Sequence, residues 1–127
     1  MRTPRQRRGS AAEEEVAAYL VALGWRVVAR NLKVGRDEID ILAVDPGPPS
    51  TLTVVEVRSL RTSAFGAPEE RVDGRKVARL YRALAGLGSA LESDAGLDQL
   101  ARRVDLVIVD RRDARTEIRH FRALEPP

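Results

Sequence analysis

The chain has 127 residues, which is a usual size for a single domain, and 43% of them are hydrophobic. It contains no cysteine and one histidine, His120, so disulfides, thiolate metal sites, cysteine nucleophiles and His-rich metal sites are excluded. The net charge is only +3, and any bound metal must be held mainly by oxygen atoms, which favours Mg²⁺, Mn²⁺ or Ca²⁺.

The first eight residues form a basic arm that contains Arg2, Arg5, Arg7 and Arg8. An acidic run, residues 13–15, follows the arm in place of an apolar stretch, so the arm is not a signal peptide. No apolar run approaches the length of a membrane helix, and we expect a cytoplasmic protein with no membrane partner. The arm either contacts phosphate groups or acts as a solubilising tail, and its charge alone fits both equally.

The first half of the chain predicts one helix followed by three strands. Ser10 can cap the helix, because Glu13 stands in the capping-box position, and Gly24 ends it. Strands are expected at residues 25–32, 38–44 and 51–58, where β-branched residues are frequent. A turn at residues 33–36 and a Pro-rich loop at residues 45–50 separate them.

The second half predicts a helix and two further strands. After a long polar connection at residues 59–73, a helix is expected at residues 74–91, with the apolar stripe Val77, Leu80, Tyr81 and Leu84. Residues 93–100 are ambiguous, residues 104–109 indicate a buried strand, and residues 117–121 indicate an edge strand. The prediction is one α/β domain at residues 10–122, in the order α-β-β-β-α-β-β, between the arm (residues 1–9) and a C-terminal tail (residues 123–127).

Acidic residues interrupt the hydrophobic pattern of two predicted strands. Alternate residues of a strand face the same side, so Glu38 and Asp40 share one face, and Glu56 and Arg58 share a face of the next strand. If the two strands pair through the Pro-rich loop, these four side chains lie on one surface. Among the helix acids, Glu13 lies nearest the apolar stripe and is best placed to face the sheet.

A cluster of carboxylates has two interpretations. Two like charges about 4 Å apart repel by roughly 1–4 kcal/mol, so the cluster is stabilised by binding a divalent cation. Alternatively, the acids are solvated and pair with nearby arginines. We weigh these interpretations about evenly for the whole set.

Several short motifs follow one another at specific spacings. They are Gly9 to Leu20, Asp37-Glu38-Ile39-Asp40-Ile41-Leu42, Val55-Glu56-Val57-Arg58 with Arg61 and Phe65-Gly66, and three further matches at Asn31, Lys76 and Val104-Asp105-Leu106-Val107. Over roughly residues 8–109, the chain resembles the UPF0102 family, also called YraN. That family is similar to the PD-(D/E)xK nucleases and archaeal Holliday-junction resolvases. The resemblance implies a restriction-endonuclease-like fold, with a central mixed β-sheet of about five strands flanked by helices.

The resemblance also implies a site for Mg²⁺ or Mn²⁺. Asp40 and Glu56 would be metal ligands, the Val57 carbonyl would be a third ligand, and Glu13 would complete the metal shell. Arg58 would stand at the position of the catalytic lysine, and Glu38 would border the site.

Two positions depart from the family pattern. Asp37 replaces a glycine, which alters the turn or adds another acid, and Arg58 replaces the commoner lysine. Arginine effectively cannot deprotonate, so water activation is assigned to the metal, while Arg58 can still stabilise charge on a phosphate.

Nucleic-acid contacts are expected from basic residues in the arm, after the third strand and on the second helix: Arg5, Arg7, Arg8, Arg61, Arg75, Lys76 and Arg79. Arg75, Arg79 and Arg82 form a stripe, which fits either a phosphate-contacting surface or a solvated helix face. Phe65-Gly66 fits a loop tip on nucleic acid or a core position. Asp105 is expected to be structural, and no catalytic role is expected for His120.

Three functions are compatible with these features. The first is a metal-dependent endonuclease acting on DNA, including branched or junction DNA. The second is a non-catalytic nucleic-acid-binding or partner-docking protein that retains the nuclease fold. The third is a structural subunit, and a homodimer would suit a two-fold junction.

Overall fold

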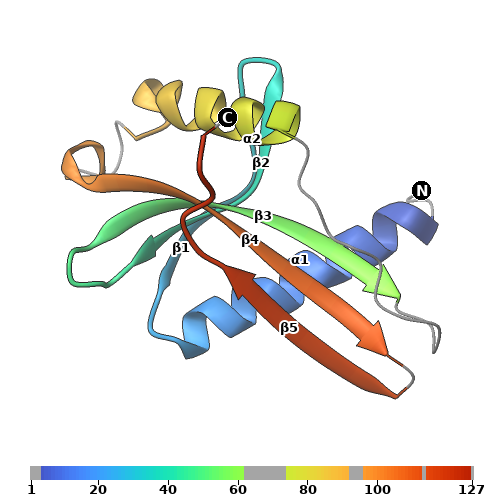
Figure 1. Ribbon diagram of the computed structural model, residues 1–127. Helices are drawn as coiled ribbons and strands as arrows, with labels where there is room; N and C mark the ends of the chain where they lie inside the picture. The colour runs from blue at the N-terminus through green and yellow to red at the C-terminus, as the bar shows by residue number, and fades with distance from the viewer. Residues whose placement is uncertain (1–3, 62–73, 92–95, 113, 127) are drawn as a thin grey trace.

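The computed structural model describes residues 4–61, 74–91, 96–112 and 114–126 (Figure 1). The main elements are α1 (Pro4–Ala22), β1 (Arg26–Val34), β2 (Asp37–Asp45), β3 (Thr51–Arg61), α2 (Gly74–Ala85), β4 (Ala101–Arg112) and β5 (Arg115–Phe121). Two short 3-10 helices, η1 (Gly88–Leu91) and η2 (Leu97–Gln99), lie between α2 and β4. The predicted order α-β-β-β-α-β-β is confirmed. No helix in the described residues is long and apolar enough to cross a membrane.

The five strands form one mixed sheet in the order β1-β2-β3-β4-β5. The β3–β4 pair is parallel and the other three pairs are antiparallel, so the mixed sheet of about five strands is confirmed. β2 and β3 pair across the Pro-rich loop, as the placement of the acids requires. β5 lies at one edge of the sheet, as predicted.

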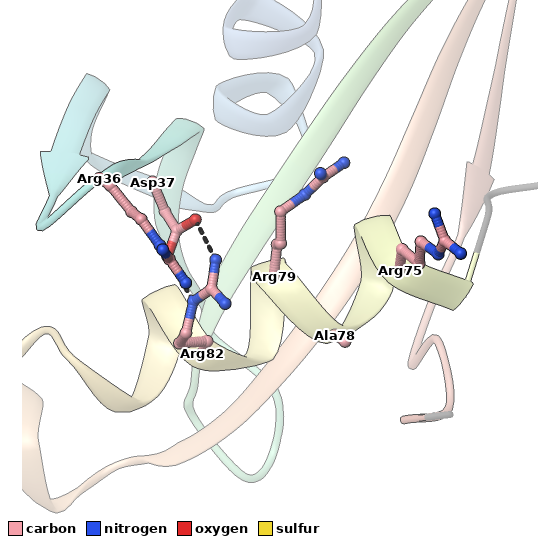
Figure 2. A pocket seen from close by; sticks show the side chains of 6 residues that line it. All are labelled: Arg36, Asp37, Arg75, Ala78, Arg79 and Arg82. Carbon is pink, nitrogen blue, oxygen red and sulfur yellow. Dashed lines mark hydrogen bonds and ion pairs between the residues drawn. The ribbon is translucent and has the colours of Figure 1, made fainter.

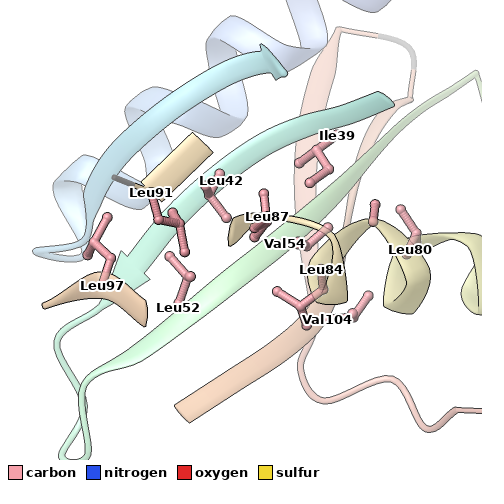
Figure 3. Packing of buried hydrophobic residues seen from close by; sticks show 11 residues of the cluster. Ile39, Leu42, Leu52, Val54, Leu80, Leu84, Leu87, Leu91, Leu97 and Val104 are labelled. Atoms are coloured by element: carbon pink, nitrogen blue, oxygen red, sulfur yellow. The ribbon is translucent and has the colours of Figure 1, made fainter. Parts of the chain in front are cut away.

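The two helices pack on opposite faces of the sheet. Val54 belongs to the apolar cluster beneath α2, and its neighbour Val55 belongs to the cluster beneath α1. Figure 3 shows the α2 cluster, in which Leu80 and Leu84 lie over Val54. The buried members of the α2 cluster are Ile39, Leu42, Leu52, Val54, Leu80, Ala83, Leu84, Leu87, Leu91, Leu97 and Val104.

Helix α1 begins at Pro4, six residues before the expected N-cap at Ser10, so the predicted helix start was wrong. Proline suits the first helical position, and the arginines and glutamine that follow have good helix propensity. The predicted end at Gly24 is close, because Gly24 adopts a φ of 90° directly after the helix. Among the α1 side chains that the structure describes, residues 11–22, the buried ones are Ala12, Val16 and Leu20, at the expected spacing of four.

Other boundaries also differ from the prediction. α2 ends at Ala85, and a Cβ at the next residue, Gly86, would lie only 3.0 Å from Val34 Cγ1, so the chain passes close to β1 there. β3 continues to Arg61, and β4 spans residues 101–112, because the two strands pair in parallel along their whole lengths. The connection at residues 62–73, which includes Phe65-Gly66, lies outside the described residues.

Candidate active site

The β2–β3 ladder ends at a carboxylate. The hydrogen-bonded register runs from Asp45 opposite Thr51 to Ile41 opposite Val55 and then stops. Beyond this point the Val57 backbone N–H donates to Asp40 Oδ2, over 2.9 Å. The Asp40 side chain therefore takes the place of a backbone partner where the two strands separate.

Glu56 lies beside this point, on the face of the sheet that α2 covers. Its side chain is 8% exposed, and Lys76 Nζ of α2 lies 3.3 Å from Glu56 Oε1. Glu56 Oε2 is buried and has no hydrogen-bond partner among the described residues. One oxygen of Glu56 is thus paired with a cation, and the other is left without the partner that a buried carboxylate needs.

Glu13 approaches the same region from α1 on the other face. Its side chain is 14% exposed and lies 4.0 Å from Arg30. It also forms a hydrogen bond with Asn31, which has a φ of 52° and lies across from Asp40 in the β1–β2 register. Asparagine tolerates this backbone conformation better than most residues do.

The electrostatics identify Glu13, Asp40 and Glu56 as one interacting set, called here the acidic site. Burial raises the pKa of Glu56 to about 7, and the charge of Asp40 adds to this rise, while Lys76 opposes it. Burial also raises the pKa of Asp40, against the hydrogen bond from Val57. The pKa of Glu13 is raised by burial and then by the charge of Asp40. The three carboxylates therefore resist being ionised together.

This arrangement fits a divalent cation that prefers oxygen ligands. The orphaned Oε2 of Glu56 and the mutual repulsion of the carboxylates are both features that a bound cation would satisfy. Within the described part of the chain, no three Asp, Glu or His side chains converge closely enough to hold an ion by themselves. Mg²⁺ commonly binds through one or two carboxylates, with water and substrate phosphates as further ligands, so Asp40 and Glu56 could suffice.

The remaining predicted members of the site lie around these two acids. The charge of Arg58 lowers the pKa of Glu56, which places its guanidinium within electrostatic reach. Glu38 is exposed, and its charge contributes to the raised pKa of Asp40. The role of the Val57 carbonyl as a third ligand stays a prediction.

The basic residues predicted to contact nucleic acid separate into groups. Arg75 and Arg79 are exposed on α2, and Arg61 is exposed at the end of β3. Lys76 is half-buried and contacts Glu56, so it belongs with the acidic site. The side chains of Arg5, Arg7 and Arg8 lie outside the described residues.

The contact between Lys76 and Glu56 was not predicted, although a signal for it was present. Lys76, Leu80 and Ala83 follow the i, i+4, i+7 spacing of one helix face, and both apolar residues are buried. A lysine on the buried face of an amphipathic helix indicates a buried anionic partner. Asn31 and Arg30 were likewise missed as partners of Glu13.

Asp37, the departure from the family glycine, does not join the acidic site. Its carboxylate accepts two hydrogen bonds from Arg82 of α2, from Nε over 2.9 Å and from the terminal nitrogen over 2.7 Å. These hydrogen bonds, together with the charge of Arg82, lower the pKa of Asp37. The pair links the start of β2 to α2.

Asp105 and His120 form a separate buried network beneath α1. Asp105 accepts hydrogen bonds from Arg103, from the Ala123 backbone and from His120 Nε2, and the other ring nitrogen of His120 lies 2.8 Å from the Tyr19 hydroxyl. Burial alone would raise the pKa of Asp105, but its bonds with His120 and Arg103 hold it below the ordinary value. Both ring nitrogens of His120 are engaged, which suits the structural assignment of these residues.

A mixed five-stranded sheet, helices on both faces and carboxylates at a strand divergence define an α/β domain with the predicted restriction-endonuclease-like architecture. The family can be stated from comparison with known sequences. The model of the uncharacterised protein family UPF0102 matches residues 12–109, so the chain belongs to that family, as its motifs predicted.

Relatives with the description "UPF0102 protein" cover most of the chain. The protein from Arthrobacter sp. (strain FB24) is 37% identical over 117 residues, which are 91% of this chain and 93% of the relative. The protein from Moorella thermoacetica is 39% identical over 110 residues, or 86% and 85% of the two chains. The protein from Deinococcus radiodurans is 34% identical over 102 residues, or 80% and 79%.

Proposed function

We propose that the chain is a divalent-metal-dependent endonuclease that hydrolyses phosphodiester bonds of DNA, including branched or junction DNA. The observation that carries this proposal is the convergence of Asp40, Glu56 and Lys76 where β2 and β3 separate. Two carboxylates and an ammonium group at one point supply both the ligands for a cation and a positive charge for a phosphate.

In this proposal Asp40 and Glu56 hold Mg²⁺ or Mn²⁺, with Glu13 and the Val57 carbonyl as the neighbouring oxygen donors. Such an ion, when bound, lowers the pKa of water and neutralises charge on the scissile phosphate. The hydrogen bond from Val57 fixes one oxygen of Asp40, so its carboxylate keeps a single orientation. Glu56, held by Lys76 through Oε1, keeps its second oxygen available.

Lys76 supplies an ammonium group near the site, where position 58 has an arginine in place of the family lysine. Arg58 cannot act as a base, but it can stabilise negative charge. The ammonium group of Lys76 lies 3.3 Å from Glu56, so a lysine stands beside the second carboxylate although it comes from α2 and not from β3. In this proposal, Lys76 and Arg58 are the two cationic groups that stabilise the charge developing on the phosphate.

The test is a cleavage assay on a labelled four-way junction, a flap and a linear duplex, with Mg²⁺ or Mn²⁺. Asp40→Asn, Glu56→Gln and Lys76→Met should each lower the initial rate by about 100-fold or more, since each removes a charge from the site. Lys33→Met is the matched control for Lys76, because Lys33 is the other lysine of the chain and is exposed on β1. Cutting that persists at the wild-type rate in the three variants would contradict the proposal.

A second candidate, a non-catalytic nucleic-acid-binding protein, is supported by a different observation. The acids of the described residues do not form a complete cage for an ion, and an arginine stands at position 58. This candidate predicts salt-sensitive DNA binding, no cutting by the wild type, and binding by Asp40→Asn that equals the wild type.

A further inference from the structure

A pocket of about 520 Å³ lies between the β1–β2 turn and the first turns of α2. It is lined by Arg36, Asp37, Arg75, Ala78, Arg79 and Arg82, and called here the arginine pocket. Figure 2 shows the side chains of Arg75 and Arg79 standing on the same side of α2, and Arg82 reaching to Asp37. Among the residues that the structure describes, four guanidinium groups and one carboxylate line the pocket, so this lining carries an excess of positive charge.

Asp37, the one acid among the described lining residues, is already paired with an arginine. Asp37 and Arg82 form a two-bond ion pair, and the charges of Arg36 and Arg79 also lower the pKa of Asp37. Three guanidinium groups therefore surround one carboxylate. Arg79 is exposed and makes no hydrogen bond or ion pair with any residue that the structure describes. The excess of positive charge around Asp37 is what a bound anion would neutralise.

The chemistry of the lining favours phosphate as that anion. Guanidinium groups bind phosphate oxygens through paired hydrogen bonds. Of the described lining residues, all but Ala78 are charged, so this lining offers little to an apolar ligand. Arg75 and Arg79 are one turn apart, about 6 Å along the helix axis, so a ligand with repeated phosphates can contact both.

The position of the pocket indicates which phosphate compound it serves. Lys76 and Arg79 are three residues apart on α2, so their side chains are neighbours on the helix surface, and Lys76 contacts Glu56 of the acidic site. In the proposed reaction the scissile phosphate lies at the acidic site, so a ligand that also reaches the pocket must carry a further phosphate next to the cleaved bond. We infer that the arginine pocket binds the backbone phosphates of nucleic acid next to the acidic site, which rests on the proposed function.

Asp37 should weaken the binding of phosphate in the arginine pocket. Its carboxylate occupies the guanidinium fork of Arg82, which a phosphate would otherwise contact in the same two-bond manner. Asp37 therefore competes with the ligand for Arg82. Removing its charge should strengthen phosphate binding, whereas removing an arginine should weaken it, and these opposite signs give a sharp test.

The experiment measures binding of a fluorescent DNA duplex by anisotropy, in EDTA so that no metal-dependent cutting occurs. The salt concentration is varied over roughly 0.05–0.3 M, because the affinity of phosphate contacts depends strongly on salt in this range. Arg36→Gln and Arg79→Gln should each weaken binding about five- to tenfold at roughly 0.1 M salt, and reduce the slope of log K against log salt by about 0.9. Asp37→Asn should tighten binding and steepen the slope. Arg115→Gln, which removes the same charge from an exposed position on β5, should stay close to the wild type.

Equal binding by Arg36→Gln, Arg79→Gln and Arg115→Gln would overturn the inference, and so would weaker binding by Asp37→Asn. Inorganic phosphate at constant ionic strength provides the other arm. Displacement of the duplex by millimolar phosphate would identify a free-phosphate site and overturn the assignment to nucleic-acid backbone. Cleavage is measured separately in Mg²⁺, so duplex binding through the pocket without any cutting would contradict the proposed function alone.

Discussion

Glu56 is buried between the sheet and α2, with one oxygen near Lys76 and the other without a hydrogen-bond partner in the described residues. Its pKa of about 7 results from burial and the charge of Asp40. An ordinary glutamate is almost fully ionised at neutral pH, whereas the raised pKa of Glu56 favours its protonated form. Ionising Glu56 therefore costs the folded protein free energy, and binding a cation or a proton at Glu56 removes this cost.

This cost predicts how stability depends on pH. The folded state binds a proton at Glu56 more tightly than the unfolded state does, so the stability from this group is complete below pH 4.5 and is lost as pH rises through about 7. A pKa difference of this size corresponds to about 3 kcal/mol. In urea unfolding with EDTA, the stability of the wild type relative to Glu56→Gln should fall by about that amount between about pH 4.5 and pH 8.

Glu117→Gln serves as the control, because Glu117 is exposed on β5, and this variant should follow the wild type at every pH. If Glu56→Gln and the wild type gave parallel curves across this pH range, the raised pKa of Glu56 would be wrong.

At this scale the sequence predicted some side chains better than others. The alternation of strand residues was enough to bring Asp40 and Glu56 together, since the two strands pair across the Pro-rich loop, which was the stated condition. The spacing within α2 indicates a buried anionic partner for Lys76, but only the packing of α2 on the sheet determines that this partner is Glu56. The pairing of Asp37 with Arg82 depends on the same packing.

At the scale of the elements, strand boundaries were predicted less well than strand identities. β3 and β4 extend beyond their predicted bounds into residues such as 59–61 and 101–103, whose composition does not indicate a strand. They are strands because each supplies the parallel partner of the other, from Thr51 opposite Ala101 to Arg61 opposite Arg111. Such pairing joins residues about fifty positions apart, so local hydrophobic patterns do not report it.

The Asp105 network joins β4, β5 and the segment after β5, and it should contribute strongly to stability. Asp105 is fully buried on β4, and it binds Arg103 of the same strand, His120 of β5 and the Ala123 backbone beyond β5. Replacing it removes the negative charge that compensates these donors. Asp105→Asn should therefore lower the free energy of unfolding by about 3 kcal/mol.

Urea unfolding measures this loss, and amide hydrogen exchange should show that β5 loses more protection than β2. The matched control is Asp98→Asn on η2, where the aspartate is exposed and the change should stay within about 0.5 kcal/mol. A loss of stability in Asp105→Asn no larger than in Asp98→Asn would show that the network contributes little.

At the scale of the whole molecule, the acidic site exists only when separate elements have assembled. Glu13 comes from α1, Asp40 from β2, Glu56 from β3, and Lys76 reaches them from α2 on the opposite face to α1. The unfolded chain does not hold these groups together. A cation that binds the site therefore binds the folded state alone, and its binding free energy adds to the stability of the whole domain.

The last prediction follows from this linkage. At pH 8, a concentration of Mn²⁺ or Mg²⁺ one hundred times its Kd should stabilise the wild type by about 2.7 kcal/mol and raise Tm by roughly 10 °C. Glu56 must be deprotonated to bind the ion, so below its pKa of about 7 the affinity should fall about tenfold for each pH unit. At pH 6 the same ion concentration should raise Tm by only about 5 °C.

Thermal unfolding of the wild type, Asp40→Asn and Glu117→Gln, with and without the ion, separates cation binding from catalysis because no DNA is present. Glu117→Gln should respond as the wild type does, and Asp40→Asn should show no rise in Tm. An equal rise in all three proteins would place the cation elsewhere on the molecule. In that case the carboxylates would bind no ion, and Lys76 and the arginine pocket would form a surface that binds nucleic acid without cutting it. This is the outcome that the second candidate function requires.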